Sequence, residues 1–419
     1  DPAFPPTPRV PAIAFSSDGT KLYGAIQTED RCRLVELDPA SGSELSSRTL
    51  AACPTSLQPM ADGSLLLRNE SGGSWADDPA VQTIVAAATR TDFVRREGSS
   101  LVWVRGDQTL RLPSLSIRDM RILDREGSIL AILEEQGSES LVRINGNGEL
   151  TRLVAEPLLS IDSFDISPDQ KEFVLSASRS GGFDVALGST ASPSVRWVAT
   201  DPLDEVLVSW APRGSKVTYL VRGRDGSLLR SLHVPTGYSL TVDLPQVHVT
   251  ALAWEPRAER YAIVASTPES SSHIQSLAYG GEARRVVLEP ARVSAGELEP
   301  FLWPGGSAWL SRPSRIGYGS SYPVVVWMGV GSPFEWSDQR AGLHEQFEAV
   351  SILGAGRMDI LTSPFWDALA LVPWVDRSRV VVVDASHETE SVTLPPGVTV
   401  IHATELSRIS LVLGAERTK

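Results

Sequence analysis

The feature that most constrains the fold is a pattern that recurs about every 44 residues through roughly the first 300 residues. Each copy has an apolar strand, a polar turn and a second apolar strand, as in Ile13–Gln27 and Phe164–Ser178. The turn centres are Asp18, Asp62, Glu126, Asp169, Arg213 and Ala258. They are 43 to 45 residues apart, except for one wider interval of 64 residues between Asp62 and Glu126. A period of about 40–45 residues with four short strands per unit is typical of a β-propeller.

Radial packing explains why such a repeat folds, because one four-stranded blade cannot bury both of its faces alone. An aromatic residue precedes four of the turns and is predicted to be inter-blade core: Phe15, Phe164, Trp210 and Trp254. The wider interval holds a further strand-rich segment, Phe93–Ser114. We therefore expect about seven blades, with six or eight left open. An array of β-sandwiches is the competing architecture, and the regular spacing disfavours it.

After residue 298 the apolar runs become continuous, which is typical of central strands in a parallel sheet covered on both faces. The runs are Val324–Trp327, Ala349–Leu353, Val380–Val383 and Val398–Ile401. Helical patterns lie between them at Gln339–Glu348 and Phe365–Val372. The sequence thus predicts a mainly β chain, with a β-propeller over residues 1–298 and a small α/β domain over residues 299–419.

The second part of the chain resembles the prolyl oligopeptidase family in six segments that follow the family's order. They are Ala308–Arg315, Tyr322–Pro333, Phe347–Asp359, Phe365–Leu369, Trp374–Glu388 and Leu394–Glu405. In Trp374–Glu388 a run of four valines leads to Ser386, the position that matches the family's nucleophile. The resemblance implies a propeller followed by a truncated α/β-hydrolase domain, and it implies serine hydrolase chemistry at Ser386.

Several positions depart from the family pattern. Asp384 and Glu388 occupy the two glycine positions of the Gly-x-Ser-x-Gly turn, where side chains are crowded. Met328–Gly331 reads Met-Gly-Val-Gly in place of the family's His-Gly-Gly-Pro. Only 33 residues follow Ser386, fewer than the family uses for its Asp and His. These departures predict that hydrolysis has been lost, because a triad works only with all of its members.

The first functional hypothesis is therefore a non-catalytic propeller protein, a pseudoenzyme that acts as a protein-binding or scaffolding subunit. Its partner would be a protein, such as a component of a membrane-associated complex. Six aromatic residues of the second domain would dock that partner or would cover the sheet internally: Trp327, Phe334, Trp336, Phe365, Trp366 and Trp374. The alternative is a divergent serine peptidase or esterase that uses Ser386. A binder of small ligands or glycans in the propeller channel is a third hypothesis.

Charge and cysteine content bear on partners and compartment. The net charge of −13 argues against nucleic acid as a partner, and no apolar run reaches the length of a transmembrane segment. The Pro-rich start at Asp1 is interpreted as a mature N-terminus after removal of a signal peptide, which predicts a periplasmic or secreted protein. In that setting Cys32 and Cys53 can form a disulfide, and two buried free thiols are the alternative.

No cofactor and no metal ion is expected. His344 and Glu348 have helical spacing for a metal but lack a third ligand nearby. The acidic turn of Asp384, His387 and Glu388 is interpreted as a polar loop. Gly354-Ala355-Gly356 lacks the remaining glycine and the acidic partner of a dinucleotide-binding motif.

Overall fold

The structure is a computed structural model, and its described residues make up most of the chain. They are 9–28, 31–69, 72–77, 83–97, 100–112, 115–123, 127–179, 182–200, 202–223, 226–267, 270–279, 284–288, 297–312, 321–328, 348–355, 363–384, 394–395 and 398–402. This part of the chain is almost entirely β, and α3 is its single helix.

Six antiparallel sheets come first along the chain, and each follows the sequence order of its strands. The first sheet holds β1 (Arg9–Phe15), β2 (Leu22–Thr28), β3 (Arg31–Leu37) and β4 (Glu44–Leu50). The second holds β5 (Ser56–Pro59), β6 (Leu65–Asn69), β7 (Gly72–Trp75), β8 (Ile84–Thr89), β9 (Asp92–Glu97), β10 (Ser100–Arg105) and β11 (Gln108–Arg111). The third holds β12 (Ile117–Leu123), β13 (Ser128–Glu135), β14 (Ser138–Asn145) and β15 (Leu150–Ala155).

The next three sheets have four strands each. The fourth holds β16 (Ser160–Ile166), β17 (Glu172–Ser178), β18 (Phe183–Ser189) and β19 (Ser192–Ala199). The fifth holds β20 (Asp204–Trp210), β21 (Lys216–Gly223), β22 (Gly226–His233) and β23 (Tyr238–Pro245). The sixth holds β24 (His248–Trp254), β25 (Arg260–Thr267), β26 (Ser270–Ala278) and β27 (Arg284–Leu288).

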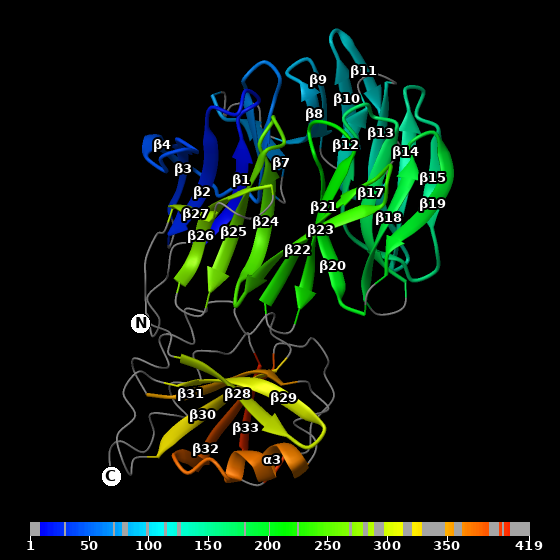
Figure 1. The fold of residues 1–419 in the computed structure, drawn as a ribbon. Coiled ribbons are helices and arrows are strands. Elements are labelled where there is room, and N and C mark those ends of the chain that lie inside the picture. Colours follow the sequence, from blue (N-terminus) through cyan, green and yellow to red (C-terminus); the bar gives the residue numbers. More distant parts are fainter. Residues whose placement is uncertain are drawn as a thin grey trace.

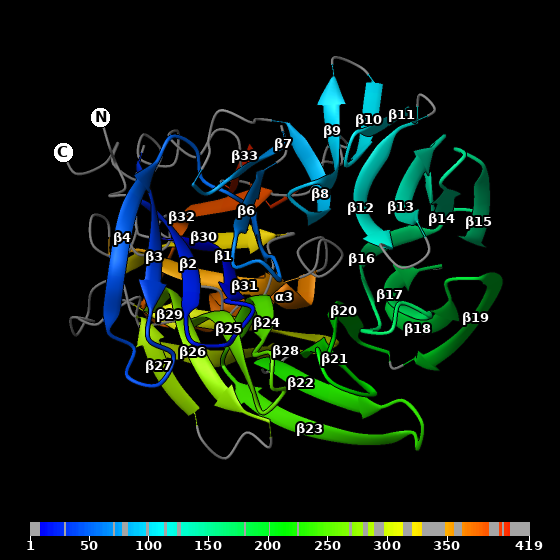
Figure 2. The ribbon, with the colours of Figure 1, turned by 90° about the horizontal axis from the view of Figure 1, so that it is seen from above.

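The six sheets are arranged around a ring, with the first sheet beside the sixth (Figure 2). β1 contacts β24, β25 and β26, while β16 contacts β20, and β20 contacts β24. In these three pairs of sheets the first strands therefore lie next to one another. This arrangement is consistent with the predicted β-propeller.

The four aromatic residues that precede the turns are buried between sheets, as predicted. Phe15 packs with Ala262 and Ile274 of the sixth sheet, and Trp210 packs with Val174 of the fourth. Phe164 and Trp254 also lie in clusters shared by two neighbouring sheets. The apolar residue before each turn therefore stabilises contacts between sheets, and the repeat in the sequence reflects this packing.

The wide interval in the repeat corresponds to the seven-stranded second sheet. Its two halves, β5–β7 and β8–β11, are joined by a single register pair, Gly73 with Ile84. A Cβ at Gly73 would lie 2.7 Å from the carbonyl oxygen of Leu67, so only glycine fits where these strands meet. The segment Phe93–Ser114, predicted to supply a compact blade here, forms β9, β10 and β11.

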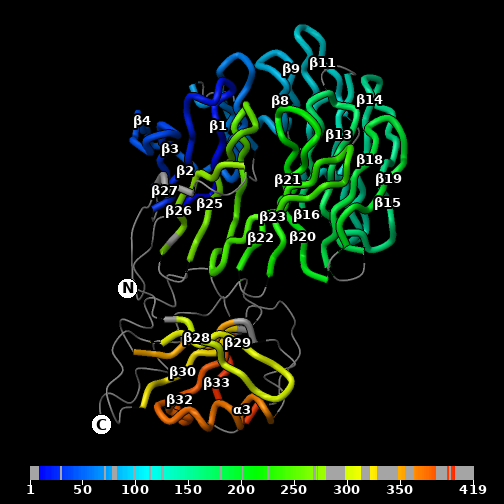
Figure 3. The backbone as a smooth tube through the Cα atoms, viewed as in Figure 1, coloured from blue at the N-terminus to red at the C-terminus, as the bar shows by residue number. Residues whose placement is uncertain are grey.

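A mixed sheet follows the antiparallel ones and lies beside one end of the ring (Figures 1 and 3). Its strands are β28 (Glu297–Trp303), β29 (Gly306–Arg312), β30 (Tyr322–Met328), β31 (Val350–Ala355), β32 (Val375–Asp384) and β33 (Val398–His402). The order is β28-β29-β31-β30-β32-β33, and the last four in this order are mutually parallel. The four continuous apolar runs are therefore parallel strands, as predicted.

One helix, α3 (Ser363–Ala370), packs on this sheet on the side away from the ring (Figure 1). It buries Phe365 and Leu369 against Phe301 and Trp303 of the β28–β29 hairpin. Most of the other predicted helix, Gln339–Glu348, lies outside the described residues. The helix content of the described chain is small, so the predicted α/β character of this part is not established by its helices.

Candidate functional site

The C-terminal edge of the parallel strands is the first candidate site. The four valines of β32 are buried because the sheet is covered on both faces: Val380 and Val382 face one apolar cluster, and Val381 and Val383 face another. β32 lies between β30 and β33. At its end Asp384 is in register with Met328 on one side and with His402 on the other. Three parallel strands thus end in one row, and Ser386 follows two residues later.

Many of the predicted site residues lie outside the described part of the chain. They are Ser386, His387, Glu388, His344, Gly356, Phe334, Trp336 and the segment 329–331. Of the predicted metal pair, only Glu348 is described, and it lies just before β31 with a positive φ of 50°. The structure therefore places the strand that leads to Ser386 and the neighbouring strand ends.

The six aromatic residues proposed as a docking surface separate into different environments. Trp327 and Phe365 are buried, with exposures of 5% and 0%, so the docking interpretation does not fit these two residues. Phe365 makes edge-to-face contacts with Trp303 at 5.2 Å and with Trp366 at 5.0 Å between ring centroids. Trp366 and Trp374 are partly buried against the same cluster. The described aromatic residues thus cover the sheet internally.

A row of alternating charges joins strands of three sheets. Arg68 on β6 and Arg121 on β12 both donate hydrogen bonds to Oδ1 of Asp119, at 3.0 Å and 2.8 Å. Burial alone would raise the pKa of Asp119, but Arg121 and Arg68 outweigh it and hold the pKa below its usual value. On β16, burial raises the pKa of Asp165, which accepts hydrogen bonds from the Trp210 amide at 2.8 Å and from Ser209 at 3.4 Å. This network was not predicted, because its members are far apart in the sequence.

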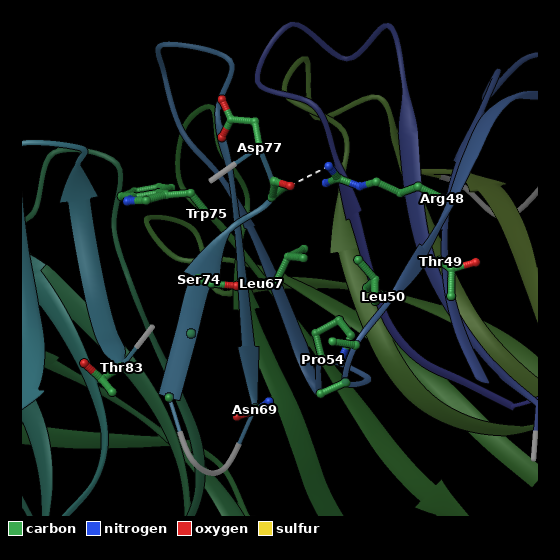
Figure 4. A pocket seen from close by; sticks show the side chains of 15 residues that line it. Arg48, Thr49, Leu50, Pro54, Leu67, Asn69, Ser74, Trp75, Asp77 and Thr83 are labelled. Atoms are coloured by element: carbon green, nitrogen blue, oxygen red, sulfur yellow. Dashed lines mark hydrogen bonds between the residues drawn. The ribbon is translucent and has the colours of Figure 1, made fainter. Parts of the chain in front are cut away.

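A cleft of about 760 Å³ lies between the first sheet and the β6–β7 strands (Figure 4). Leu50 and Pro54 approach from the first sheet, and the side chains of Leu67 and Ser74 point toward them from the opposite wall (Figure 4). The Trp75 ring points away from Leu50 (Figure 4). Sequence analysis missed this cleft, although the Gly-Gly-Ser run at 72–74 marks a strand with little side-chain volume.

One side chain bridges the cleft at its edge. The Arg48 guanidinium donates a hydrogen bond to the carbonyl oxygen of Ala76, from the first sheet to the end of β7 (Figure 4). Arg48, Ala76 and Asp77 also line a smaller neighbouring cavity of about 290 Å³. The two cavities therefore lie on either side of the Arg48 bridge, along one seam between the sheets.

The segment after β4 is fixed by a disulfide. The structure joins Cys32 of β3 to Cys53, 21 residues later, and Cys53 packs against the apolar cluster shared by the first two sheets. Ala51, Ala52 and Pro54, which flank Cys53, line the larger cleft. The disulfide therefore holds one wall of the cleft in place.

No family model matches the sequence, and no curated protein matches it either. Solved structures match the fold along nearly its whole length. A puromycin hydrolase has a TM-score of 0.65 at 13% identity, with 90% of this chain and 73% of that chain covered. A Pyrococcus horikoshii acylaminoacyl peptidase has a TM-score of 0.62 at 10% identity, with 91% of this chain and 73% of that chain covered. A Porphyromonas gingivalis dipeptidyl peptidase 4 has a TM-score of 0.58 at 11% identity, with 88% of this chain and 71% of that chain covered.

The resemblance to the prolyl oligopeptidase family is confirmed at the level of the fold. Two predictions are corrected by the same comparison. The non-catalytic scaffold and the pseudoenzyme are contradicted, because the solved chains that share this fold are peptidases and hydrolases by name. The number of residues after Ser386 is no argument against hydrolysis, because this chain covers 73% of the puromycin hydrolase's length. Identities this low establish the fold alone, so the activity itself is a proposal.

Proposed function

We propose that this chain is a divergent serine hydrolase of the prolyl oligopeptidase type, a peptidase or esterase that uses Ser386 as its nucleophile. The observation that carries the proposal is the position of β32. This strand is buried on both faces between parallel neighbours, and it ends at Asp384, two residues before Ser386. A serine just after a central parallel strand is exposed at the sheet edge, where an acyl group can reach it.

The finer architecture belongs to the same proposal. The β5–β7 and β8–β11 halves of the second sheet, counted as separate blades, give a seven-bladed propeller over residues 1–298. The mixed sheet with α3 is then a small α/β hydrolase-like domain over residues 299–419. The parallel order of β31, β30, β32 and β33 supports the α/β character of this domain. The start of β28 at Glu297 supports the proposed boundary.

The chemistry would begin with attack of the Ser386 hydroxyl on an acyl carbon, and it needs a base that takes the hydroxyl proton. His402 is the candidate base, because its backbone lies in register with Asp384 on the adjacent strand. The sequence has Asp384 and Glu388 at the two positions where the family's nucleophile turn has glycine. Negative charge near a developing oxyanion opposes its stabilisation, so we expect slow turnover.

The decisive experiment is labelling of the purified protein with a fluorophosphonate, which reacts with activated serines. We expect one adduct on Ser386, found by mass spectrometry of the peptide that contains it, and none in Ser386→Ala. Ser378→Ala is the matched control, since Ser378 lies on the same strand and its hydroxyl donates to Asp376. Absence of labelling in the wild-type protein, or equal labelling of Ser386→Ala, would overturn the proposal.

An extracytoplasmic location is proposed alongside this activity. Its support is the Cys32–Cys53 disulfide, because structural disulfides persist in oxidising compartments. Among the described residues, no helix has the length and apolar character needed to cross a bilayer. Fractionation of the source cells, with trapping of free thiols, would check the location and the redox state together. A protein partner stays a prediction, which copurification from the same cells would test.

A further inference from the structure

A small cavity of about 80 Å³ lies where the two halves of the second sheet meet the third sheet. It is lined by the end of β6, by the starts of β7, β8 and β12, and by one residue of β9. Of its described lining residues, three are arginines, Arg68, Arg96 and Arg118, and one is acidic, Asp119. We call it the arginine cavity. A water molecule occupies about 30 Å³ in the liquid, so the cavity has room for a group of a few heavy atoms.

A bulge in β12 brings two of these charged residues to the same cavity. In a regular strand, consecutive side chains point to opposite faces of the sheet. The register between β12 and β13 shifts between Ile117 and Asp119, which leaves Arg118 as the extra residue. Arg118 and its neighbour Asp119 can therefore both line the cavity. Bulges of this kind re-aim a side chain and are over-represented beside functional sites.

Two of the three lining arginines have acidic partners within the chain. The Nε of Arg118 donates to Oε1 of Glu139 at 2.6 Å, and Arg68 pairs with Asp119 at 3.0 Å. The Asp119 carboxylate is shared, because Arg121 donates to the same oxygen at 2.8 Å. Arg68 therefore has only part of one negative charge as its counter-ion.

Arg96 is the lining arginine that lacks such a partner. Within the described part of the chain, its exposed side chain forms no ion pair and no hydrogen bond, and the adjacent Glu97 pairs with Arg95 at 2.6 Å instead. Asp165 attracts Arg121 from the next sheet. Even when Asp165 is counted as charged, four guanidinium groups around the cavity meet three carboxylates.

Arg68 shows the effect of this excess of positive charge. Burial lowers the pKa of Arg68, and repulsion by Arg121 lowers it further, while Asp119 opposes both. Arg68 donates to Asp119 and to the Val85 carbonyl at 2.9 Å, which uses two of the five N–H donors of a guanidinium. An anion in the cavity would add negative charge where it is short, and its oxygens would accept hydrogen bonds from the remaining donors.

The arginine cavity lies at the end of the ring that is beside the mixed sheet. The first strands β8 and β12 begin at the cavity, and β6 ends there. The fourth strand of a sheet runs antiparallel to the first, so β27 ends where β24 begins, at this same end. The mixed sheet starts at Glu297, nine residues after Leu288, and nine residues span at most about 30 Å (Figure 1).

We propose that the arginine cavity binds an oxyanion group, a carboxylate or a phosphate, through Arg96 and the remaining N–H donors of Arg68 and Arg118. This binding does not depend on the chemistry at Ser386. The identification of the carboxylate as the C-terminus of a peptide substrate does rest on the proposed peptidase function. A carboxylate held at this end of the ring lies toward the sheet whose strand β32 leads to Ser386.

The test is direct binding to the Ser386→Ala protein, so that no turnover intervenes. One probe is a fluorescein-labelled peptide of Ala and Ser with a free C-terminal carboxylate, compared with the same peptide amidated, and the readout is fluorescence anisotropy. The other probe is inorganic phosphate, measured by calorimetry at constant ionic strength. We expect the free carboxylate to bind at least about tenfold more tightly than the amide, a difference of about 1.4 kcal/mol.

Arg96→Gln should remove that difference without changing the unfolding midpoint in urea, because its side chain has no partner to lose among the described residues. Arg96→Glu should do the same, since it places a carboxylate of the chain's own at the cavity. Arg111→Gln is the matched control, because Arg111 is also exposed on the second sheet and donates to Ser100 at 3.0 Å, away from the cavity. This control should bind both probes as the parent does.

Each outcome is decisive. A preference for the peptide carboxylate that Arg96→Gln abolishes supports the site and identifies a peptide terminus as its ligand. Phosphate binding that Arg96→Gln weakens, with equal binding of the two peptides, supports the site and identifies free phosphate. Binding of neither probe, or equal binding by the parent and Arg96→Gln, overturns it. Failure of the proposed function is seen separately, as absence of fluorophosphonate labelling in a wild-type protein that still binds the anion.

Discussion

Arg68 of β6 and Asp119 of β12 form an ion pair of 3.0 Å that joins two sheets across 51 residues of sequence. Both side chains are largely buried, with 15% and 23% of their surfaces exposed. The same Asp119 oxygen also accepts hydrogen bonds from Arg121 and from the backbone amide of Met120, both at 2.8 Å. One carboxylate thus compensates two arginines at the inner side of the ring.

Removal of that carboxylate should be costly, because it leaves the buried Arg68 guanidinium without its ion-pair partner and removes one of the two carboxylates that attract Arg121. We expect Asp119→Asn to lower the free energy of unfolding by about 2–4 kcal/mol, measured by urea denaturation. Asp243→Asn, at an exposed position of β23, is the control and should change stability by less than about 0.5 kcal/mol. An equal effect of the two substitutions would show that the ion pair contributes nothing specific.

The Asp18 turn gives a prediction about acid. The Ser16 hydroxyl, the Thr20 amide and the Thr20 hydroxyl all donate to Asp18, and they lower its pKa from 3.8 to about 2. Because the folded pKa is the lower one, the stabilisation is complete above 3.8 and is lost as the pH falls toward 2. We expect the stability difference between wild type and Asp18→Asn to shrink below pH 4 in denaturation series. Asp107→Asn, on another exposed turn, is the control, and a difference that does not change with pH would contradict this account.

The Cys32–Cys53 disulfide closes a loop with a sequence separation of 21 residues. A cross-link of this span restricts the unfolded chain and contributes about 3 kcal/mol. We expect the double variant Cys32→Ser, Cys53→Ser to unfold at correspondingly lower urea concentration. Wild-type protein treated with a dithiol should match the double variant, and a reductant should leave the double variant unchanged. A reductant effect on the double variant would mean that another process is being measured.

Local patterns in the sequence were enough to predict the strands and turns of the ring. The turns around Asp18, Asp62 and Asp169 recur because each carboxylate accepts hydrogen bonds from a residue two positions later, which is local chemistry. The apolar runs such as Val380–Val383 likewise predicted parallel strands. The cleft between the first sheet and β6–β7 and the pairing of Arg68 with Asp119 could not be predicted, because the packing of the sheets around the ring decides which of them meet.

Phe365 anchors α3 to the mixed sheet. Its side chain is fully buried, and its ring meets those of Phe301, Trp303 and Trp366 at centroid distances of 5.0–5.8 Å. We expect Phe365→Ala to lower stability by about 3–5 kcal/mol, because it opens a cavity in this cluster. Leu371→Ala, just beyond the helix and 83% exposed, is the control and should be nearly neutral. A neutral result for Phe365→Ala in urea denaturation would mean that the helix contributes little to the sheet.

His402 gives the sharpest prediction about the proposed chemistry. It ends β33 in register with Asp384, so it is the histidine whose backbone lies beside the strand that leads to Ser386. A general base contributes about 10²–10⁴ to the rate, so His402→Ala should slow fluorophosphonate labelling by about 10² or more while leaving the unfolding midpoint in urea unchanged. His233→Ala is the matched control, because His233 lies on β22 of the ring and its Nδ1 is within 2.6 Å of the Thr236 hydroxyl. The pH profile separates the roles: a base gives a labelling rate that rises through the pKa of the histidine, and His402→Ala should abolish that rise. If the labelling rate of His402→Ala still rises with pH, a group other than His402 takes the proton, and the assignment of His402 as the base is wrong.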